Sequence, residues 1–248
     1  MTKTVLITGA SRGIGRAAAI LAGREGWSVG VNYTNAAKAA AEVVDLITKA
    51  GSDAIAIKGN VAIETDVIAM FDATEKALGS IDAVVVNAGV LDKAMPLAEM
   101  TFDRMKRIFD INVLGAYLTA REAVRRMSTR HGGKGGTIIF MSSAAARLGA
   151  PGEFVDYAGS KGAIDTLTLA LAKEVGREGI RVTGIRPGII DTDIHEDAGS
   201  RERVERLGKT TPFGRHGTPE EVAEAVVWLM SDKASYVSGT IIDVTGAR

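Results

Sequence analysis

The chain has 248 residues, of which 46% are hydrophobic and 24% are charged, and its 30 basic residues are balanced by 30 acidic ones. This composition is that of an ordinary globular protein and excludes extensive disorder. Because the net charge is zero, the sequence predicts neither nucleic acid nor an anionic membrane as a partner. The lack of cysteine excludes disulfides, thiolate metal sites and a cysteine nucleophile, and we expect no metal site.

Two features of the sequence concern location in the cell. Met1-Thr2-Lys3-Thr4 leads directly into an apolar stretch, which leaves no room for a signal peptide. No apolar run approaches the ~20 residues that are needed to span a bilayer. We therefore expect a cytoplasmic protein that does not contact a membrane.

Residues 5–15 have the pattern of a strand, a tight turn and the start of a helix. Apolar Val5-Leu6-Ile7 is followed by three glycines and then by an alanine-rich segment from Arg16. Glycine permits a positive φ and the close approach of a ligand to the backbone. The unpaired N–H groups and the dipole at a helix N-terminus favour a diphosphate. The place of this turn after the first strand favours a dinucleotide site over a turn that serves packing alone.

Predicted strands and helices alternate along the chain. Strands are expected over residues 5–7, 28–33, 53–58, 81–86, 137–141, 180–185 and 241–244. Helices are expected over residues 16–21, 36–50, 65–78, 102–127, 157–175 and 222–230, the last after a capping box that begins at Thr218. This alternation predicts an α/β protein: one doubly wound, Rossmann-like domain over residues 1–248, with a seven-stranded parallel sheet and helices on both faces.

Residues 191–208 differ from the rest because they are polar and lack a regular period. At that length an irregular segment is more often functional than a failed helix. We therefore expect a substrate lid at about residues 189–217.

The type of cofactor is indicated by charge placement. In folds of this kind, an acid about 20 residues after the glycines binds the ribose 2′-hydroxyl of NAD. Here that region reads Asn32-Tyr33-Thr34-Asn35, without an acid. Arg12 lies inside the glycine turn, where its guanidinium could bind a 2′-phosphate, although it could also be a solvated loop residue. NADP(H) is therefore favoured over NAD(H).

A candidate catalytic pair lies on the helix expected at residues 157–175. Tyr157 and Lys161 are one turn apart, so both side chains leave the same face. A nearby ammonium and a positive nicotinamide ring would lower the pKa of the phenol toward neutrality. Ser142 and Ser143 end the fifth predicted strand, where either hydroxyl could bind a substrate carbonyl or serve an ordinary strand-end role.

Three further polar or small motifs lie at predicted strand ends or inside a helix. Asn112 is in the middle of the helix expected at residues 102–127, as a functional residue or as a structural bridge between helix and strand. Asn87-Ala88-Gly89 ends the fourth strand, where small residues permit close approach of a cofactor and Asn87 could equally cap the strand. Pro187-Gly188 ends the sixth strand, and Thr192 follows within reach of a nicotinamide amide.

Taken together and in this order, these motifs resemble the short-chain dehydrogenase/reductase family over essentially the whole chain. Thr8-Gly9-Ala10-Ser11-Arg12-Gly13-Ile14-Gly15 resembles the family's cofactor turn, and Asn112, Ser143, Tyr157 and Lys161 resemble its catalytic tetrad. The resemblance implies that Tyr157 exchanges the proton, Lys161 lowers its pKa and holds the nicotinamide ribose, Ser143 orients the substrate, and Asn112 holds a water. The interval between Ser143 and Tyr157 is one residue longer than usual, so Ser142 stays an alternative.

The resemblance also implies a set of cofactor-binding residues. They are Gly9, Ser11, Arg12, Gly13, Ile14, Gly15, Asn32, Tyr33, Thr34, Asn60, Val61, Asn87, Ala88, Gly89, Tyr157, Lys161, Pro187, Gly188, Ile190 and Thr192. Asn60-Val61 stands where the family commonly has Asp-Val, and an amide can still accept a hydrogen bond from the adenine amino group.

Within the family, the sequence resembles 3-oxoacyl-[acyl-carrier-protein] reductases and glucose 1-dehydrogenases. A small-molecule carbonyl or alcohol is therefore the expected substrate, most simply a ketone or 3-oxoacyl compound reduced with NADPH. A sugar or polyol dehydrogenase using NAD(P) and a non-catalytic dinucleotide sensor are the alternatives. The helix expected at residues 157–175 is apolar on more than one side, and this predicts a homotetramer or homodimer.

Overall fold

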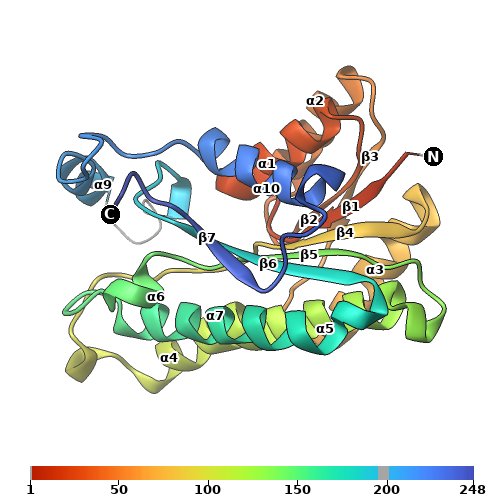
Figure 1. The fold of residues 1–248 in the computed structure, drawn as a ribbon. Coiled ribbons are helices and arrows are strands. Elements are labelled where there is room, and N and C mark those ends of the chain that lie inside the picture. Colours follow the sequence, from red (N-terminus) through yellow and green to blue (C-terminus); the bar gives the residue numbers. More distant parts are fainter. Residues whose placement is uncertain (1, 195–200) are drawn as a thin grey trace.

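The computed structural model describes residues 2–194 and 201–248, and within them seven parallel strands form one sheet. In space the strands run in the order β3-β2-β1-β4-β5-β6-β7, so the chain winds outward from β1 first in one direction and then, after a crossover, in the other (Figure 1). This confirms the predicted fold class. The strands are β1 (Thr4–Ile7), β2 (Ser28–Tyr33), β3 (Ala54–Lys58), β4 (Ile81–Val86), β5 (Gly136–Met141), β6 (Ile180–Pro187) and β7 (Thr240–Val244).

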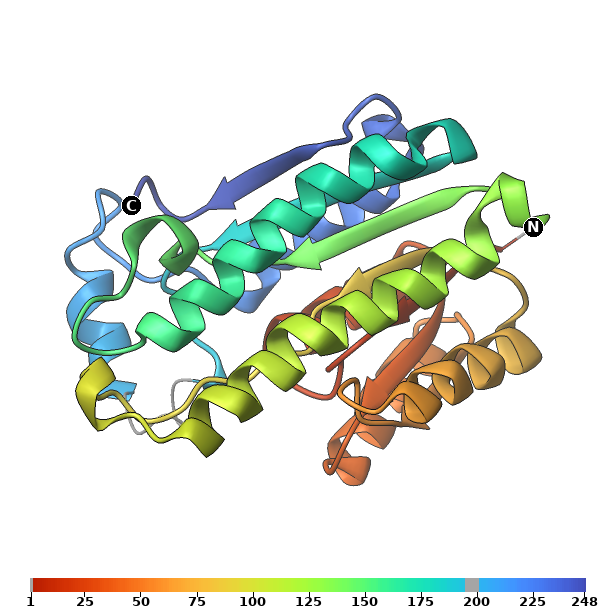
Figure 2. The same ribbon diagram turned by 90° about the horizontal axis from the view of Figure 1, so that it is seen from below.

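Helices cover both faces of the sheet. In Figure 1, α1, α2 and α10 lie above it, and α4, α5 and α7 lie below. Figure 2 shows α5 and α7 side by side across the lower face. The helices are α1 (Gly13–Arg24), α2 (Ala37–Lys49), α3 (Glu64–Leu78), α4 (Phe102–Phe109), α5 (Gly115–Met127), α6 (Ala145–Leu148), α7 (Val155–Val175), α9 (Arg201–Gly208) and α10 (Pro219–Met230).

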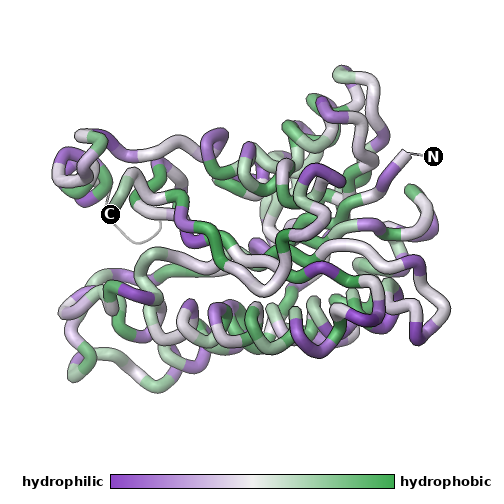
Figure 3. Tube along the Cα trace, viewed as in Figure 1, coloured by the Kyte–Doolittle hydropathy of each residue, from purple (hydrophilic) through white to green (hydrophobic). Residues whose placement is uncertain are grey.

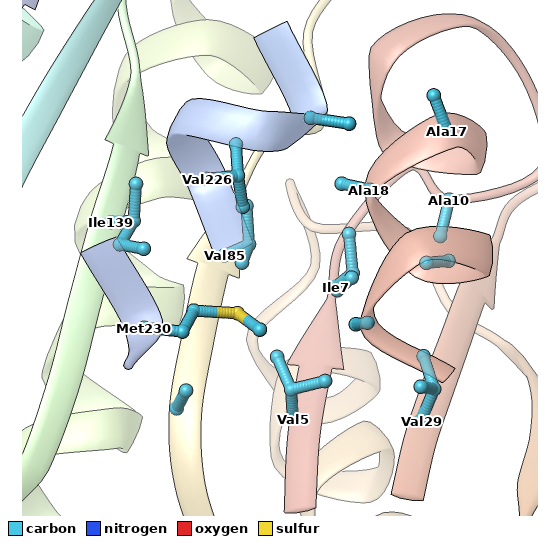
Figure 4. Packing of buried hydrophobic residues seen from close by; sticks show 14 of the residues in the cluster. Val5, Ile7, Ala10, Ala17, Ala18, Val29, Val85, Ile139, Val226 and Met230 are labelled. Atoms are coloured by element: carbon cyan, nitrogen blue, oxygen red, sulfur yellow. The ribbon is translucent and has the colours of Figure 1, made fainter. Parts of the chain in front are cut away.

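The core has two layers because successive side chains of a strand point to opposite faces. Val5 and Ile7 of β1 pack with α1 and α10 on the upper face, where Val226 and Met230 of α10 lie over β4 and β5 (Figure 4). Leu6 points to the lower face and joins the cluster built by α3, α5 and α7. Apolar residues accordingly follow the strands and the inner sides of the helices (Figure 3).

The short helix α6 was not predicted, and two longer parts of the chain also differ from the predicted elements. The helix expected over residues 102–127 contains a π-helical stretch, Asp110–Leu114, between α4 and α5. The segment expected to be irregular contains α9, so that part of the prediction is wrong. The eight residues of α9 include only two large apolar side chains, which is too few to predict a helix from the sequence. Burial of Val204, which is 2% exposed, stabilises this helix through tertiary packing.

The remaining part of the lid prediction is not tested, since residues 195–200 lie outside the described residues. In the described part of the chain, no helix has the length and apolar character required to cross a bilayer.

Candidate active site

A cavity of about 760 Å³ lies along the carboxyl ends of the strands. This is the edge at which open α/β sheets bind ligands. Of the residues predicted for the site, the structure brings all but Asn32 and Asn112 to the cavity wall. Segments far apart in the sequence therefore meet in one place.

The glycine turn between β1 and α1 leaves room for a ligand because side chains are excluded there. Gly9 and Gly13 have φ values of 64° and 54°. A Cβ on Gly15 would lie 2.4 Å from the Gly9 carbonyl oxygen and 2.5 Å from Asn87 Nδ2. The Asn87 amide donates to the Thr8 and Gly9 carbonyls at 2.8 and 3.1 Å and so holds the turn against the end of β4. This glycine cradle at the start of a twelve-residue helix fits the diphosphate of a dinucleotide.

Asn32 holds the same turn from behind instead of lining the cavity. The residue is 1% exposed, its Oδ1 accepts from the Gly9 N–H at 3.0 Å, and its Nδ2 donates to the Gly59 carbonyl at 3.0 Å. The cavity wall is formed instead by the residues that follow, Tyr33, Thr34, Asn35 and Ala36. Asn35 was not among the predicted site residues. Its position directly after Thr34, just beyond the end of β2, could have indicated that it lines the cavity.

Tyr157 and Lys161 leave α7 on the cavity side. The Lys161 ammonium is 5.6 Å from the centre of the Tyr157 ring and donates to the Met141 carbonyl at 2.7 Å. Burial lowers the pKa of Lys161 to about 8, and the negative charge of Asp165 partly opposes that fall. Burial raises the pKa of the Tyr157 phenol, opposite to the shift expected from the ammonium, because desolvation of a phenolate is the largest effect in the structure.

The two serines at the end of β5 have different partners. Ser143 hydrogen-bonds with the Tyr157 phenol, and this contact opposes the rise of the pKa of Tyr157. The Ser142 hydroxyl points elsewhere and donates to Asp165 Oδ1 at 2.6 Å. The structure therefore places Ser143, and not Ser142, beside Tyr157.

Asn112 lies in the π-helical stretch and bridges two elements. Its Oδ1 accepts from the Val90 N–H at 2.8 Å, and its Nδ2 donates to the Val90 carbonyl at 3.0 Å and to Ser160 Oγ at 3.2 Å. The structural bridge considered for this residue is present. A Cβ on Gly89 would lie 3.4 Å from both Asn112 Oδ1 and Lys161 Nζ, so Asn112 also lies close to Lys161.

Beyond Tyr157 the cavity has an apolar wall with charged groups at its margin. Leu91 and Phe154 are buried and pack with Tyr157 and other partly buried residues. The Arg203 guanidinium of α9 lies 5.2 Å from the centre of the Phe154 ring and pairs with Glu153 at 2.7 Å. Arg203 also lines the cavity, which the sequence did not indicate because α9 itself was not predicted.

Comparison with known proteins identifies the family of this chain. The profile of the family described as Enoyl-(Acyl carrier protein) reductase matches residues 9–246. With the fold and the motifs described above, this match shows that the chain belongs to the short-chain dehydrogenase/reductase family and is an oxidoreductase of that family. The family uses nicotinamide cofactors.

Individual relatives are similar over nearly their whole length. The chain is 49% identical over 243 residues to "Uncharacterized oxidoreductase YgfF" of Escherichia coli (strain K12), covering 98% of each chain. It is 39% identical to 3beta-hydroxysteroid dehydrogenase 1 of Eggerthella lenta, covering 98% of this chain and 92% of that protein. The crystal structure of 3-ketoacyl-(acyl-carrier-protein) reductase from Brucella melitensis complexed with NADH matches with a TM-score of 0.91 and 29% identity, covering 99% and 98% of the two chains.

Proposed function

We propose that this protein is an NADP(H)-dependent reductase of ketones or 3-oxoacyl compounds, with Tyr157 as the proton donor. The observation that carries the proposal is the meeting of Tyr157, Ser143 and Lys161 at one wall of the cavity. A neutral phenol is the form that donates a proton, and burial keeps Tyr157 in that form. This favours the reductive direction.

The residues of the site divide the work of carbonyl reduction. A bound nicotinamide supplies the hydride. The Ser143 hydroxyl orients the substrate carbonyl, and Tyr157 transfers its proton to the carbonyl oxygen as negative charge develops there. The Lys161 ammonium stabilises the phenolate that Tyr157 becomes. We propose that Asn112 keeps its family role of holding a water beside Lys161.

Replacement of Tyr157 tests the chemistry. Tyr157→Phe removes the proton donor but leaves the ring, so we expect turnover to fall about a thousandfold while cofactor binding is retained. Steady-state rates on a panel of ketones, 3-oxoesters and sugars, together with fluorescence titration of cofactor, measure the two effects separately. Wild-type activity in Tyr157→Phe would contradict the proposal. Turnover of sugars alone would favour the dehydrogenase alternative.

The preference for NADP(H) is supported by the residues around the cradle. Arg12 precedes α1 on the cavity wall, and Tyr33 and Thr34 occupy the end of β2 without an acid. A guanidinium beside a 2′-phosphate forms charge-assisted hydrogen bonds, whereas an acid there would repel it. The turn, Asn60-Val61 and the Asn87-Ala88-Gly89 segment would hold the adenosine and diphosphate, and Pro187-Gly188, Ile190 and Thr192 the nicotinamide.

Arg12→Ala tests this preference. We expect the Kd for NADPH to rise about tenfold to a hundredfold, the loss of a hydrogen bond to a charged group, with the Kd for NADH nearly unchanged. Fluorescence titration with both nucleotides measures the two constants. An equal change in both would show that Arg12 does not contact a 2′-phosphate.

The substrate and assembly proposals rest on apolar surfaces. Leu91 and Phe154 beside Tyr157 favour a substrate with apolar groups next to its carbonyl. On the outer side of the molecule, Phe109 of α4 and Tyr117 of α5 are 42% and 46% exposed. Exposed apolar residues of this kind support a homotetramer or homodimer, which light scattering in solution tests.

A further inference from the structure

Three successive residues at the end of β5 each contact a different polar group of α7. The Met141 carbonyl accepts from Lys161 Nζ at 2.7 Å, and Ser143 contacts the Tyr157 phenol. Between them, the Ser142 hydroxyl donates to Asp165 Oδ1 at 2.6 Å. The first and third contacts belong to the proposed catalytic residues. The middle contact involves a carboxylate to which the mechanism above gives no role.

Asp165 is held by hydrogen-bond partners on both carboxylate oxygens and does not line the cavity. Its Oδ2 accepts from Arg186 Nε at 2.9 Å and Nη2 at 2.8 Å, so both carboxylate oxygens have partners. Arg186 also forms an ion pair with Asp243 of β7, and its Nη1 lies 3.6 Å from Asp243 Oδ1. Neither Asp165 nor Arg186 lies on the cavity wall. Any influence of Asp165 on the reaction must therefore pass through the residues it contacts.

A nearby negative charge would stabilise the protonated form of Lys161, because this residue is buried. Lys161 is 4% exposed, and a desolvated ammonium is costly unless a negative charge lies nearby. Among the described residues, Tyr157 and Asp165 are the titratable groups that face Lys161 from α7. Arg186 of β6 pairs with Asp165, so its positive charge offsets part of the negative charge of that carboxylate. β5 faces Lys161 with the neutral Met141 carbonyl, and the segment before α5 faces it with the Asn112 amide.

We propose that Asp165 is a positioning residue for Tyr157 and Lys161. Asp165 holds the Ser142 hydroxyl and thereby fixes the end of β5 between Met141 and Ser143. Asp165 also lies one helical turn after Lys161 on α7, where its negative charge favours the protonated ammonium. Arg186 orients the carboxylate toward Ser142. The catalytic consequence rests on the function proposed above, whereas the effect on Lys161 itself does not.

A pH titration of the Lys161 side chain tests the effect of the charge. In protein with ¹³C-labelled lysine, the Cε resonance of Lys161 is assigned by its absence in Lys161→Met. We expect a midpoint at about 8 in the wild type. In Asp165→Asn the midpoint should fall by about one pH unit, because the amide keeps an acceptor for Ser142 but loses the charge. An unchanged midpoint overturns the proposal.

Two matched variants complete this titration, which needs neither cofactor nor substrate and so stands even if the proposed function fails. Glu174→Gln removes an exposed carboxylate from the same helix and should leave the midpoint of Lys161 unchanged. Asp165→Glu keeps the charge and should restore a midpoint at about 8. A midpoint as low as that of Asp165→Asn would show that charge is not the cause.

Ser142→Ala tests whether the contact between Ser142 and Asp165 aligns the end of β5. This variant can also be measured if Asp165→Asn does not fold. This variant keeps the Asp165 charge but removes the hydroxyl that contacts Asp165 Oδ1 at 2.6 Å and the Lys161 carbonyl at 3.2 Å. We expect an unchanged Lys161 midpoint, a kcat about tenfold lower and an unchanged KM, because the reacting groups are less well aligned. A wild-type kcat in Ser142→Ala overturns the positioning role.

Discussion

Gly15 lies where the first turn of α1 meets the end of β1. A Cβ there would lie 2.4 Å from the Gly9 carbonyl oxygen and 2.5 Å from Asn87 Nδ2, and backbone cannot move aside cheaply. We predict that Gly15→Ala lowers the free energy of unfolding by about 1–3 kcal/mol, the usual cost of overpacking. It should also raise the Kd for NADPH at least about tenfold, because the turn that holds the diphosphate is displaced. Chemical denaturation and fluorescence titration measure the two effects.

Gly176 provides the control for this substitution. It lies at the end of α7 with helical backbone angles, and a Cβ there would meet nothing within 4 Å. Gly176→Ala should therefore leave the Kd for NADPH unchanged and the free energy of unfolding equal or slightly higher, since alanine restricts the unfolded chain. Equal losses in both variants would contradict the explanation by close contact at Gly15.

At the scale of elements, a buried ion pair joins α4 to the start of α7. Arg104 and Asp156 have side chains that are 6% and 1% exposed, and Arg104 Nε lies 2.8 Å from Asp156 Oδ2. Asp156 Oδ1 also accepts from the Tyr157 N–H at 2.8 Å. The pair thus fixes the first turn of α7, from which the proposed proton donor projects. Arg104 also donates to the Lys93 carbonyl, which ties in the segment after β4.

Removal of one member of this pair leaves the other charge buried. We predict that Arg104→Met lowers the free energy of unfolding by about 3–5 kcal/mol. Lys106→Met on the same helix breaks only the exposed pair with Asp110 and should cost about 0.3–0.5 kcal/mol. Denaturant unfolding of both variants measures the difference. A loss in Arg104→Met no larger than that in Lys106→Met would show that the buried pair does not hold α7.

At the scale of the whole molecule, the buried Lys161 links stability to pH. Its pKa is 10.5 in the reference state and about 8 in the folded protein. Below pH 8 both states carry the proton, and the folded state bears the full cost of the buried charge. Above pH 8 the folded state releases the proton while the unfolded state keeps it up to about pH 10.5, so stability rises with pH across this interval.

Comparison with Lys161→Met isolates this effect. We predict that the free energy of unfolding of the wild type, relative to Lys161→Met, rises by about 2 kcal/mol between about pH 7 and 9.5. Measurements stay below pH 10 because the reference pKa of the Tyr157 phenol is 10.0, so about half of this phenol is ionised in the unfolded chain at that pH. Denaturant unfolding at several pH values provides the data. A constant difference would mean that the ammonium is not destabilised by burial.

Much of the molecule was determined by the sequence alone. The alternation of apolar strands with periodic helices predicted the parallel sheet, and the glycines after β1 and the spacing of Tyr157 and Lys161 predicted where the site would lie. These features depend on local periodicity and on the rule that the carboxyl ends of parallel strands meet at one edge. They do not require knowledge of which distant side chains become neighbours.

Only the tertiary structure decided which neighbouring side chains meet. It separated Ser143, beside Tyr157, from Ser142, beside Asp165, and it turned Asn32 inward to hold the glycine turn. It also interrupted the helix around Asn112 with a π-helical stretch and formed α9 by burying Val204. The partners of these groups come from other elements of the fold, so packing of the whole chain, and not local propensity, selects among the side chains that a motif offers.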